Sequence, residues 1–365
     1  MATGTIRAGT GGRQWEGPPL ALAEPVHGHR SDIDALRALA VGLVVLFHMS
    51  ESTLEAGFVG VDVFFVLSGF LITGLLNAEV VTTGGVDLGR FWARRIRRLL
   101  PASTLTLMVV VIGSLWLTSP LRWEQLARTA VSAVFYLSNV FFAGQEADYF
   151  AADVQTNPLL HYWSLSVEEQ FYLIWPVVFL ALGRLGRRRG PAFGADLRLA
   201  VAIGLGVLSF TYSLTLTDTQ TTLAYYSPFS RAWEFLAGAV LALLQSRRPA
   251  VRSGERADGT NPLTRQLVAT AGLGLILGSL LVVSPTRSFP APSGLLPVLG
   301  TVLFLTAAVR PADPLGRAMR IRPVQYVGRL SYSLYLWHWP FLVIGRQYLQ
   351  SESPVVVVGL SLIHI

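Results

Sequence analysis

The sequence predicts an all-α fold: a polytopic membrane helix bundle of about ten transmembrane helices, of which the last is truncated. The first observation is composition. Of 365 residues, 52% are hydrophobic and only 14% are charged, whereas soluble domains carry roughly 25% charged residues. The second is a mean hydropathy of +0.49. The third is that arginines gather between the apolar runs, as the positive-inside rule requires.

Two residue types are missing altogether. The chain has no cysteine and no lysine, so that all 29 basic residues are arginine. The absence of cysteine excludes a thiol nucleophile, a thiolate metal site and disulfides. The net charge of +7 comes from arginines between hydrophobic spans, and we therefore expect membrane lipids rather than nucleic acid as a partner.

The order of segments predicts three regions. Residues 1–31 are rich in glycine and polar side chains and lack an apolar core, which indicates a flexible cytoplasmic tail rather than a signal peptide. Residues 32–350 form the membrane domain. Residues 351–365 are expected to be a truncated final transmembrane helix, because their apolar run is too short to cross a hydrocarbon core of about 30 Å.

The first span, residues 36–50, carries an arginine and a histidine. Arg37 and His48 lie eleven positions apart, which is about three turns, so that both side chains share one helix face roughly 16 Å apart along the axis. Arg37 lies near the helix end, where its side chain can reach the interface. His48 lies deeper and is therefore a functional candidate. The alternative is a structural histidine bonded to a neighbouring helix.

The second span, residues 58–76, contains a carboxylate and three glycines. Gly60, Gly69 and Gly74 are expected to let neighbouring helices approach closely, because small residues line helix contacts in lipid. Asp62 is a polar candidate near the start of this span.

A basic segment, residues 90–100, follows the second span. Its cluster of four arginines, Arg94, Arg95, Arg97 and Arg98, is interleaved with apolar side chains. One interpretation is an interfacial helix that sets topology and contacts anionic lipids. The other is a cytoplasmic phosphate-binding patch, because guanidinium groups bind phosphate through paired hydrogen bonds.

Further apolar runs complete the predicted membrane domain. They are residues 102–118, 126–143, 171–183, 198–216, 232–244, 267–283, 294–309 and 330–345. If all basic loops are cytoplasmic, the weakest run, 126–143, must cross incompletely or be re-entrant, since an even number of crossings separates two cytoplasmic loops. This arrangement has ten crossings and a cytoplasmic amino terminus.

Two pairs of charged residues lie at the ends of these runs. Glu168 and Glu169 begin an apolar helix at its predicted outer mouth, either as helix caps or as part of a site beside Trp163. Arg231 and Glu234 are three residues apart on one helix face, where they are able to form an ion pair.

A second intramembrane histidine lies in the last long run. His338 is flanked by two tryptophans and lies three residues after Tyr335, which makes it a functional candidate or, alternatively, a packed and bonded histidine. The chain has no Walker A, HExxH or GxSxG sequence. Nothing therefore indicates ATP-driven transport, a metal site or a hydrolase triad.

Six segments in order resemble the membrane acyltransferase-3 family. They are DIDALRALAVGLVVLFH, GFVGVDVFFVLSGFLIT, RFWARRIRRLLP, HYWSLSVEEQFYLIWP, SPFSRAWEFLAGA and GRLSYSLYLWHWP. Members of this family O-acylate surface polysaccharide, lipopolysaccharide or peptidoglycan, or modify macrolide-type molecules. The resemblance covers about residues 32–350. It implies a multi-pass enzyme of the bacterial inner membrane that moves an acyl group, commonly acetyl, from cytoplasmic acyl-CoA to an extracytoplasmic glycan or lipid-linked sugar.

The resemblance also implies roles for individual residues. The expected catalytic residues are His48, Glu168 and Glu169, with His48 as either a general base or a transient acyl carrier. The expected contacts of the donor, acetyl-CoA, are Arg37, Arg94, Arg95, Arg97 and Arg98. The expected acceptor contacts are Asp62, Arg231, Glu234, Tyr335 and His338. Acyl-CoA would be a co-substrate, with no permanently bound cofactor or metal. Some family members carry an extracytoplasmic SGNH esterase-like domain, which is not found in this sequence. The resemblance therefore implies one of two alternatives: a separate SGNH-type partner is needed, or the sequence has lost this domain.

Two other classes of function compete with an acyltransferase. A proton-coupled permease for a polar solute would use His48, Glu168 and His338 as a proton relay. A membrane scaffold would not need His48 at all. A permease needs no site for coenzyme A, so that dependence on acyl-CoA and the role of the arginine cluster separate these hypotheses.

Overall fold

The computed structural model describes residues 30–49, 54–117, 119–145, 156–247, 261–284 and 288–349. The regular elements in these ranges are helices, which confirms the predicted all-α class. Five helices are long and apolar enough to cross a membrane, and the chain is a polytopic helix bundle; the total of ten crossings stays a prediction. Most of the predicted tail and the whole predicted final helix lie outside the described residues.

Local capping signals explain where several of the helices begin. The side chains of Ser227 and Asn261 each accept a hydrogen bond from the backbone N–H of the second residue in the helix that follows. Pro228 and Pro262 occupy the first position of these two helices. The α-helices are α1 (Ser31–Met49), α2 (Gly60–Thr83), α3 (Leu88–Leu117), α4 (Trp123–Val134), α5 (Ser138–Gln145), α6 (Tyr162–Arg187), α7 (Pro191–Thr219), α8 (Thr221–Tyr226), α9 (Pro228–Ser246), α10 (Pro262–Val282), α11 (Leu295–Ala307), α12 (Pro314–Met319) and α13 (Arg322–Leu349). Short 3-10 turns, η1 (Gly57–Val59) and η2 (Pro120–Arg122), precede α2 and α4.

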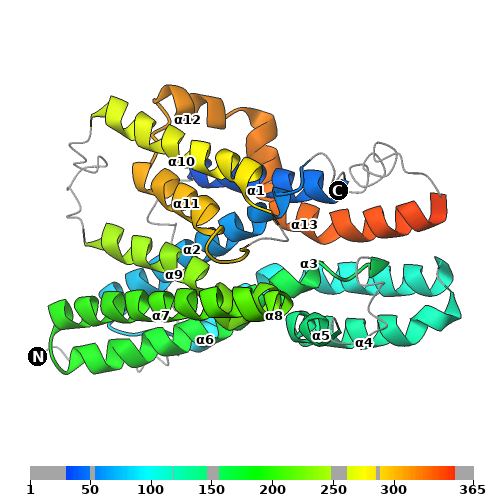
Figure 1. The fold of residues 1–365 in the computed structure, drawn as a ribbon. Helices are drawn as coiled ribbons and strands as arrows, with labels where there is room; N and C mark the ends of the chain where they lie inside the picture. The colour runs from blue at the N-terminus through cyan, green and yellow to red at the C-terminus, as the bar shows by residue number, and fades with distance from the viewer. Residues whose placement is uncertain are drawn as a thin grey trace, which may run out of the picture. The chain divides into compact units, whose positions relative to one another are not determined.

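Two helix pairs position the residues of interest. α1 packs along α13, and α2 packs along α9 (Figure 1). The α2–α9 contact is close because glycine lies on both helices. A Cβ atom added to Gly69 would lie 1.8 Å from the backbone oxygen of Phe235, and one added to Gly238 would lie 2.0 Å from that of Val66.

The predicted packing role is confirmed for two of the three glycines in α2 and is wrong for the third. A Cβ atom on Gly60 would lie 2.3 Å from the backbone oxygen of Ala40 on α1. A Cβ atom on Gly74 meets no atom within 4 Å. Gly74 follows Gly69 by five positions, which turns it about 140° away from the α9 contact.

The basic segment is not a separate interfacial helix. Residues 90–100 and the apolar run after them form one continuous helix, α3, with Pro101 inside it. Membrane helices tolerate an internal proline where neighbouring groups satisfy the freed backbone carbonyl. The arginine cluster therefore extends from the end of a helix that is long enough to cross a membrane.

The weak run 126–143 is divided between two helices, α4 and α5. The break is at Tyr136, whose φ of 51° is left-handed. Gln170 on α6 donates to the backbone oxygen of Tyr136 at 2.8 Å and to Oδ1 of Asn139 at 2.9 Å, which satisfies polar groups at the break. Because α4 has only 12 residues, it covers about 18 Å. This agrees with the prediction that the run does not cross as one helix.

A buried ion pair connects α10 to the turn before α12. Nε and Nη2 of Arg265 donate to the two carboxylate oxygens of Asp313, each at 3.1 Å. The hydrogen bonds from Arg265 lower the pKa of Asp313 below its ordinary value. The pair stabilises the fold at a place that contributes no residue to the cavities described next.

Candidate active site

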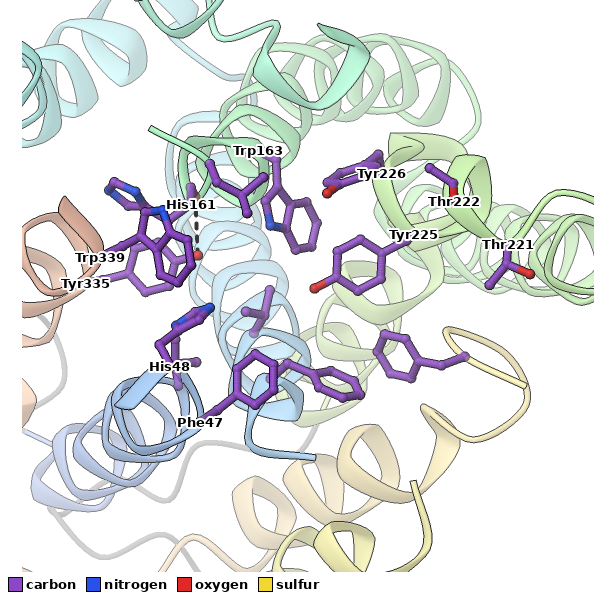
Figure 2. A pocket seen from close by; sticks show the side chains of 15 residues that line it. Phe47, His48, His161, Trp163, Thr221, Thr222, Tyr225, Tyr226, Tyr335 and Trp339 are labelled. Atoms are coloured by element: carbon purple, nitrogen blue, oxygen red, sulfur yellow. Dashed lines mark hydrogen bonds between the residues drawn. The ribbon is translucent and has the colours of Figure 1, made fainter. Parts of the chain in front are cut away.

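Two cavities lie along α1. The first, here called the histidine cavity, has a volume of about 240 Å³. It is lined by Val44, Phe47, His48, Phe58, Val61, Leu160, His161, Trp163, Thr221, Thr222, Tyr225, Tyr226, Phe289, Tyr335 and Trp339. Figure 2 shows His48 of α1 on one side of the cavity and Trp163 of α6 and Tyr225 of α8 on the other. Aromatic rings make up most of the remaining wall.

His48 is bonded to a second histidine on α13. Its Nδ1 lies 3.1 Å from Nε2 of His338. Nδ1 of His338 lies 2.6 Å from the backbone oxygen of Tyr335 and must donate to it, because a carbonyl only accepts. In a neutral His338, Nε2 is then the acceptor, and Nδ1 of His48 is the donor. With both imidazoles neutral, this arrangement leaves Nε2 of His48 without a proton, which is the form that a general base requires.

The end of α1 that carries His48 is held from two sides. Nη2 of Arg346 donates to the backbone oxygens of His48 and Met49, at 2.8 and 3.0 Å, and so satisfies carbonyls that the helix end leaves without partners. The Trp339 ring lies 4.6 Å from the imidazole, centroid to centroid. Its indole N–H donates to the backbone oxygen of Asn157 at 2.8 Å. These contacts restrict where the imidazole can lie.

The second cavity, here called the arginine cavity, also measures about 240 Å³. Of the arginines predicted to contact a donor, Arg37, Arg95 and Arg98 line it, whereas Arg94 and Arg97 do not. Arg98 is exposed, as Arg94 and Arg97 are. The remaining lining residues are Val61, Phe64, Phe65, Leu67, Ser68, Leu71, Leu75, Leu99, Ser164, Leu165, Glu168, Tyr172, Ser331, Tyr332 and Tyr335. Arg37 and His48 thus line different cavities along the same helix.

Glu168 lies in the arginine cavity and not beside His48. Its Oε1 accepts hydrogen bonds from the hydroxyls of Ser68 and Tyr172. The guanidinium of Arg95 lies 4.9 Å from the centroid of the Tyr172 ring, so that a cation and a carboxylate share this wall. Glu169 lines neither cavity. The two acids separate because consecutive residues of a helix point about 100° apart.

Asp62, Arg231 and Glu234 form a buried cluster behind the histidine cavity. Arg231 pairs with Asp62 at 2.9 Å and with Glu234 at 3.2 Å, and the three side chains are at most 1% exposed. The predicted pairing of Arg231 with Glu234 is confirmed. The guanidinium lies 5.0 Å from the Phe289 ring and 5.8 Å from the Tyr225 ring, both of which line the cavity. The cluster itself lines neither cavity, so that it supports the aromatic wall from behind.

Several residues of the histidine cavity carry no readable signal in the sequence. The short helix α8 contributes two threonines and two tyrosines from a polar segment without a motif. Phe289 comes from the turn between α10 and α11, and His161 immediately precedes α6.

In the part of the chain that the structure describes, no group of three or more His, Cys, Asp or Glu side chains could hold a metal ion. The arginine cavity is the part suited to a charged co-substrate.

Comparisons with known proteins agree with this arrangement. A family model described as an acyltransferase domain matches residues 30–364. Peptidoglycan O-acetyltransferase OatA of Listeria monocytogenes is 34% identical over 326 residues, which cover 88% of this chain and 51% of that protein. O-acetyltransferase OatA of Staphylococcus aureus is 33% identical over 327 residues, 89% and 53% of the two chains. Putative peptidoglycan O-acetyltransferase YrhL of Bacillus subtilis is 33% identical over 332 residues, 90% and 51%.

No solved structure matches the chain. The chain spans about half the length of the curated relatives it matches. The matched region nevertheless contains both cavities and all six segments on which the resemblance was based. The chain therefore belongs to the acyltransferase family, and its two cavities lie in the domain that defines this family.

Proposed function

We propose that the chain is a membrane O-acyltransferase that moves an acetyl group from cytoplasmic acetyl-CoA to a hydroxyl of an extracytoplasmic cell-wall glycan. The observation that carries this proposal is the hydrogen bond between Nδ1 of His48 and Nε2 of His338, at a cavity that adjoins an arginine-lined cavity. The printed names of relatives from Listeria monocytogenes and Bacillus subtilis, peptidoglycan O-acetyltransferases, support peptidoglycan as the acceptor.

In this proposal, His48 is the general base. The acceptor hydroxyl gives its proton to Nε2 while its oxygen attacks the carbonyl carbon of the acyl thioester. A carbon–oxygen ester bond forms, the carbon–sulfur bond breaks, and the imidazolium returns the proton to the departing thiolate. His338 stabilises the imidazolium because its Nε2 accepts the hydrogen bond from Nδ1 of His48. Acyl-CoA is consumed as a co-substrate.

The donor enters through the arginine cavity. Its volume of about 240 Å³ is below the roughly 300–1,000 Å³ of sites that enclose a drug-sized ligand, so that only the thioester end of a nucleotide donor fits inside. The phosphates bind outside this space to the guanidinium groups of Arg95 and Arg98, which match phosphate geometry. Arg94 and Arg97 add positive charge near the phosphates without contacting the donor.

The acceptor sugar occupies the histidine cavity. Its aromatic wall, which includes Trp163, Tyr225 and Phe289, offers flat apolar surfaces to the apolar face of a sugar ring. The hydroxyl of Thr221 donates to the backbone oxygen of Thr217 at 3.0 Å and is able to accept a hydrogen bond from a sugar hydroxyl. A cavity with many rings and few polar groups orients such a ligand while it excludes water from the attacking oxygen.

The proposed orientation in the bacterial inner membrane is supported by the placement of arginines along the chain. The amino end of α1, with Arg37, faces the cytoplasm, where acyl-CoA and the arginine-rich segments lie. His48 lies about three turns further along the helix, toward the outer side. The donor thus binds from one side and the acceptor from the other, while Arg37 and His48 lie roughly 16 Å apart along the helix.

The experiment uses the full chain purified and reconstituted in liposomes, with acetyl-CoA radiolabelled in the acetyl group and soluble peptidoglycan fragments as the acceptor. We expect labelled O-acetyl glycan and one free CoA thiol for each ester formed. Folded protein that neither binds acetyl-CoA nor forms labelled glycan would contradict the proposal and favour the permease. The permease is disfavoured because Glu168 lies in a different cavity from His48.

A further inference from the structure

Two side chains separate the histidine cavity from the arginine cavity. Val61 on α2 and Tyr335 on α13 are the residues that line both cavities within the part of the chain that the structure describes. Every other lining residue belongs to one cavity alone. The two cavities therefore meet at a junction bounded by an aliphatic side chain on one helix and a phenol ring on another.

The junction is held in place by contacts on several sides. Val61 is 6% exposed and Tyr335 is 7% exposed. The hydroxyl of Tyr335 is hydrogen-bonded to Oγ of Ser164 and donates to the backbone oxygen of His161 at 3.4 Å. The Phe64 ring meets the Tyr335 ring edge to face, with centroids 6.3 Å apart. The Tyr335 ring cannot swing aside without breaking these contacts.

We propose that Val61 and Tyr335 set the acyl-chain length that the enzyme accepts. This inference rests on the proposed function. The thioester carbonyl has to lie at the junction, because its sulfur comes from the arginine cavity and its carbon is attacked by a hydroxyl in the histidine cavity. The chain beyond the carbonyl then packs against these two side chains. An acetyl group adds one methyl there, whereas a longer acyl group needs space that they occupy.

The expected size of the effect follows from other apolar pockets. One methylene that does not fit is discriminated by about 10- to 200-fold. We therefore expect the wild type to transfer acetyl at least about 10-fold more efficiently than propionyl. Removal of two methyl groups in Val61→Ala creates space for one more carbon, so that the ratio of propionyl to acetyl transfer rises by about 10-fold.

The test compares acetyl-, propionyl- and butyryl-CoA with the reconstituted full chain and soluble peptidoglycan fragments, and measures kcat/KM for each donor. Val61→Ala is compared with Val63→Ala, a matched control. Val63 lies on the same helix and is fully buried, but it lines neither cavity. Val61→Ile narrows the junction and is expected to lower propionyl transfer more than acetyl transfer. Tyr335→Phe keeps the ring but removes the hydrogen bond to Ser164. We expect this variant to raise the ratio of propionyl to acetyl transfer less than Val61→Ala does.

The possible outcomes distinguish failure of this inference from failure of the proposed function. A raised ratio in Val61→Ala, an unchanged ratio in Val63→Ala and a lowered ratio in Val61→Ile would support it. An unchanged ratio in both folded Val61 variants, with normal acetyl transfer by the wild type, overturns the inference and leaves the proposed function intact. A wild type that transfers no acyl group from any of the three donors overturns both. If Val61→Ala does not fold, the opposite shift in Val61→Ile decides.

Discussion

The histidine cavity and the arginine cavity have the same volume, about 240 Å³, and both touch α1, yet their walls differ in chemistry. One contains imidazole and aromatic rings and the other contains three guanidinium groups and a carboxylate. His48 and Arg37, eleven residues apart on α1, lie one in each. The difference teaches that a single helix can separate the binding of a charged donor from the chemistry performed on it.

The largest effect is expected from removal of the His48 imidazole, the proposed general base. His48→Ala is expected to lower acetyl transfer by about 10²- to 10⁴-fold, the usual contribution of a general base. Binding of acetyl-CoA is expected to stay unchanged, because His48 does not line the arginine cavity. The measurements are the transfer rate and the acetyl-CoA dissociation constant of the same purified sample.

A second variant of His48 distinguishes the loss of its basic nitrogen from the loss of its side-chain packing. His48→Gln retains a side chain that is able to donate to His338 but has no basic nitrogen, so that it should be as inactive as His48→Ala. Normal transfer by either folded variant would remove His48 from the mechanism and would leave it as a structural histidine bonded to α13.

A smaller effect, on donor affinity, is expected from a substitution in the arginine cavity. Arg98→Ala removes a guanidinium that lines the arginine cavity, and hydrogen bonds to charged groups contribute about 1.5–3 kcal/mol. The dissociation constant of acetyl-CoA should therefore rise by about 10- to 100-fold. The rate of transfer from bound donor should change little, and the loss should shrink at high salt.

Arg97→Ala is the matched control for this variant. Arg97 lies in the same cluster and is exposed, as Arg98 is, but it does not line the cavity. We expect its removal to change donor affinity by less than about threefold, as for an exposed charge. Equal losses in Arg97→Ala and Arg98→Ala would show that the cluster acts through its total charge or through topology and not through this cavity.

The smallest effect on either cavity is expected from a site outside both. Because the pKa of Asp313 is lowered by Arg265, its carboxylate stabilises the fold above the pKa of about 3.9 that it has when unfolded. This stabilisation is lost as the pH falls through the lower pKa of the folded state. Asp313→Asn should lower the unfolding temperature at neutral pH and flatten its decline in acid.

Thermal unfolding of detergent-solubilised wild type and Asp313→Asn between about pH 7 and pH 3 measures this dependence. Transfer and donor binding at neutral pH, at a temperature where both proteins are folded, should be the same for the two. Parallel unfolding curves at all pH values would show that Asp313 has no lowered pKa in the folded protein. Altered donor binding would show that the pair influences a cavity from a distance.

Much of the architecture could be predicted from local sequence. Apolar length and arginine placement indicated the helix bundle, and the eleven-residue spacing correctly placed Arg37 and His48 along one helix. The structure divides the run 126–143 between two helices, while its incomplete or re-entrant crossing stays a prediction. These features depend on composition and on the 3.6-residue period, which act over a few turns and need no knowledge of neighbouring helices.

Other features required the tertiary structure. The hydrogen bond between His48 and His338 joins residues 290 positions apart, and no local pattern specifies such a contact. Gly69 and Gly74 look alike in the sequence, but only Gly69 faces α9. Glu168 was expected among the catalytic residues, in a site beside Trp163, and instead lines the arginine cavity with Ser68 and Tyr172. The face that each helix turns to its neighbours is decided by packing across the whole bundle, because lipid and protein interior are equally apolar and the apolar character of a face does not tell which of the two it contacts.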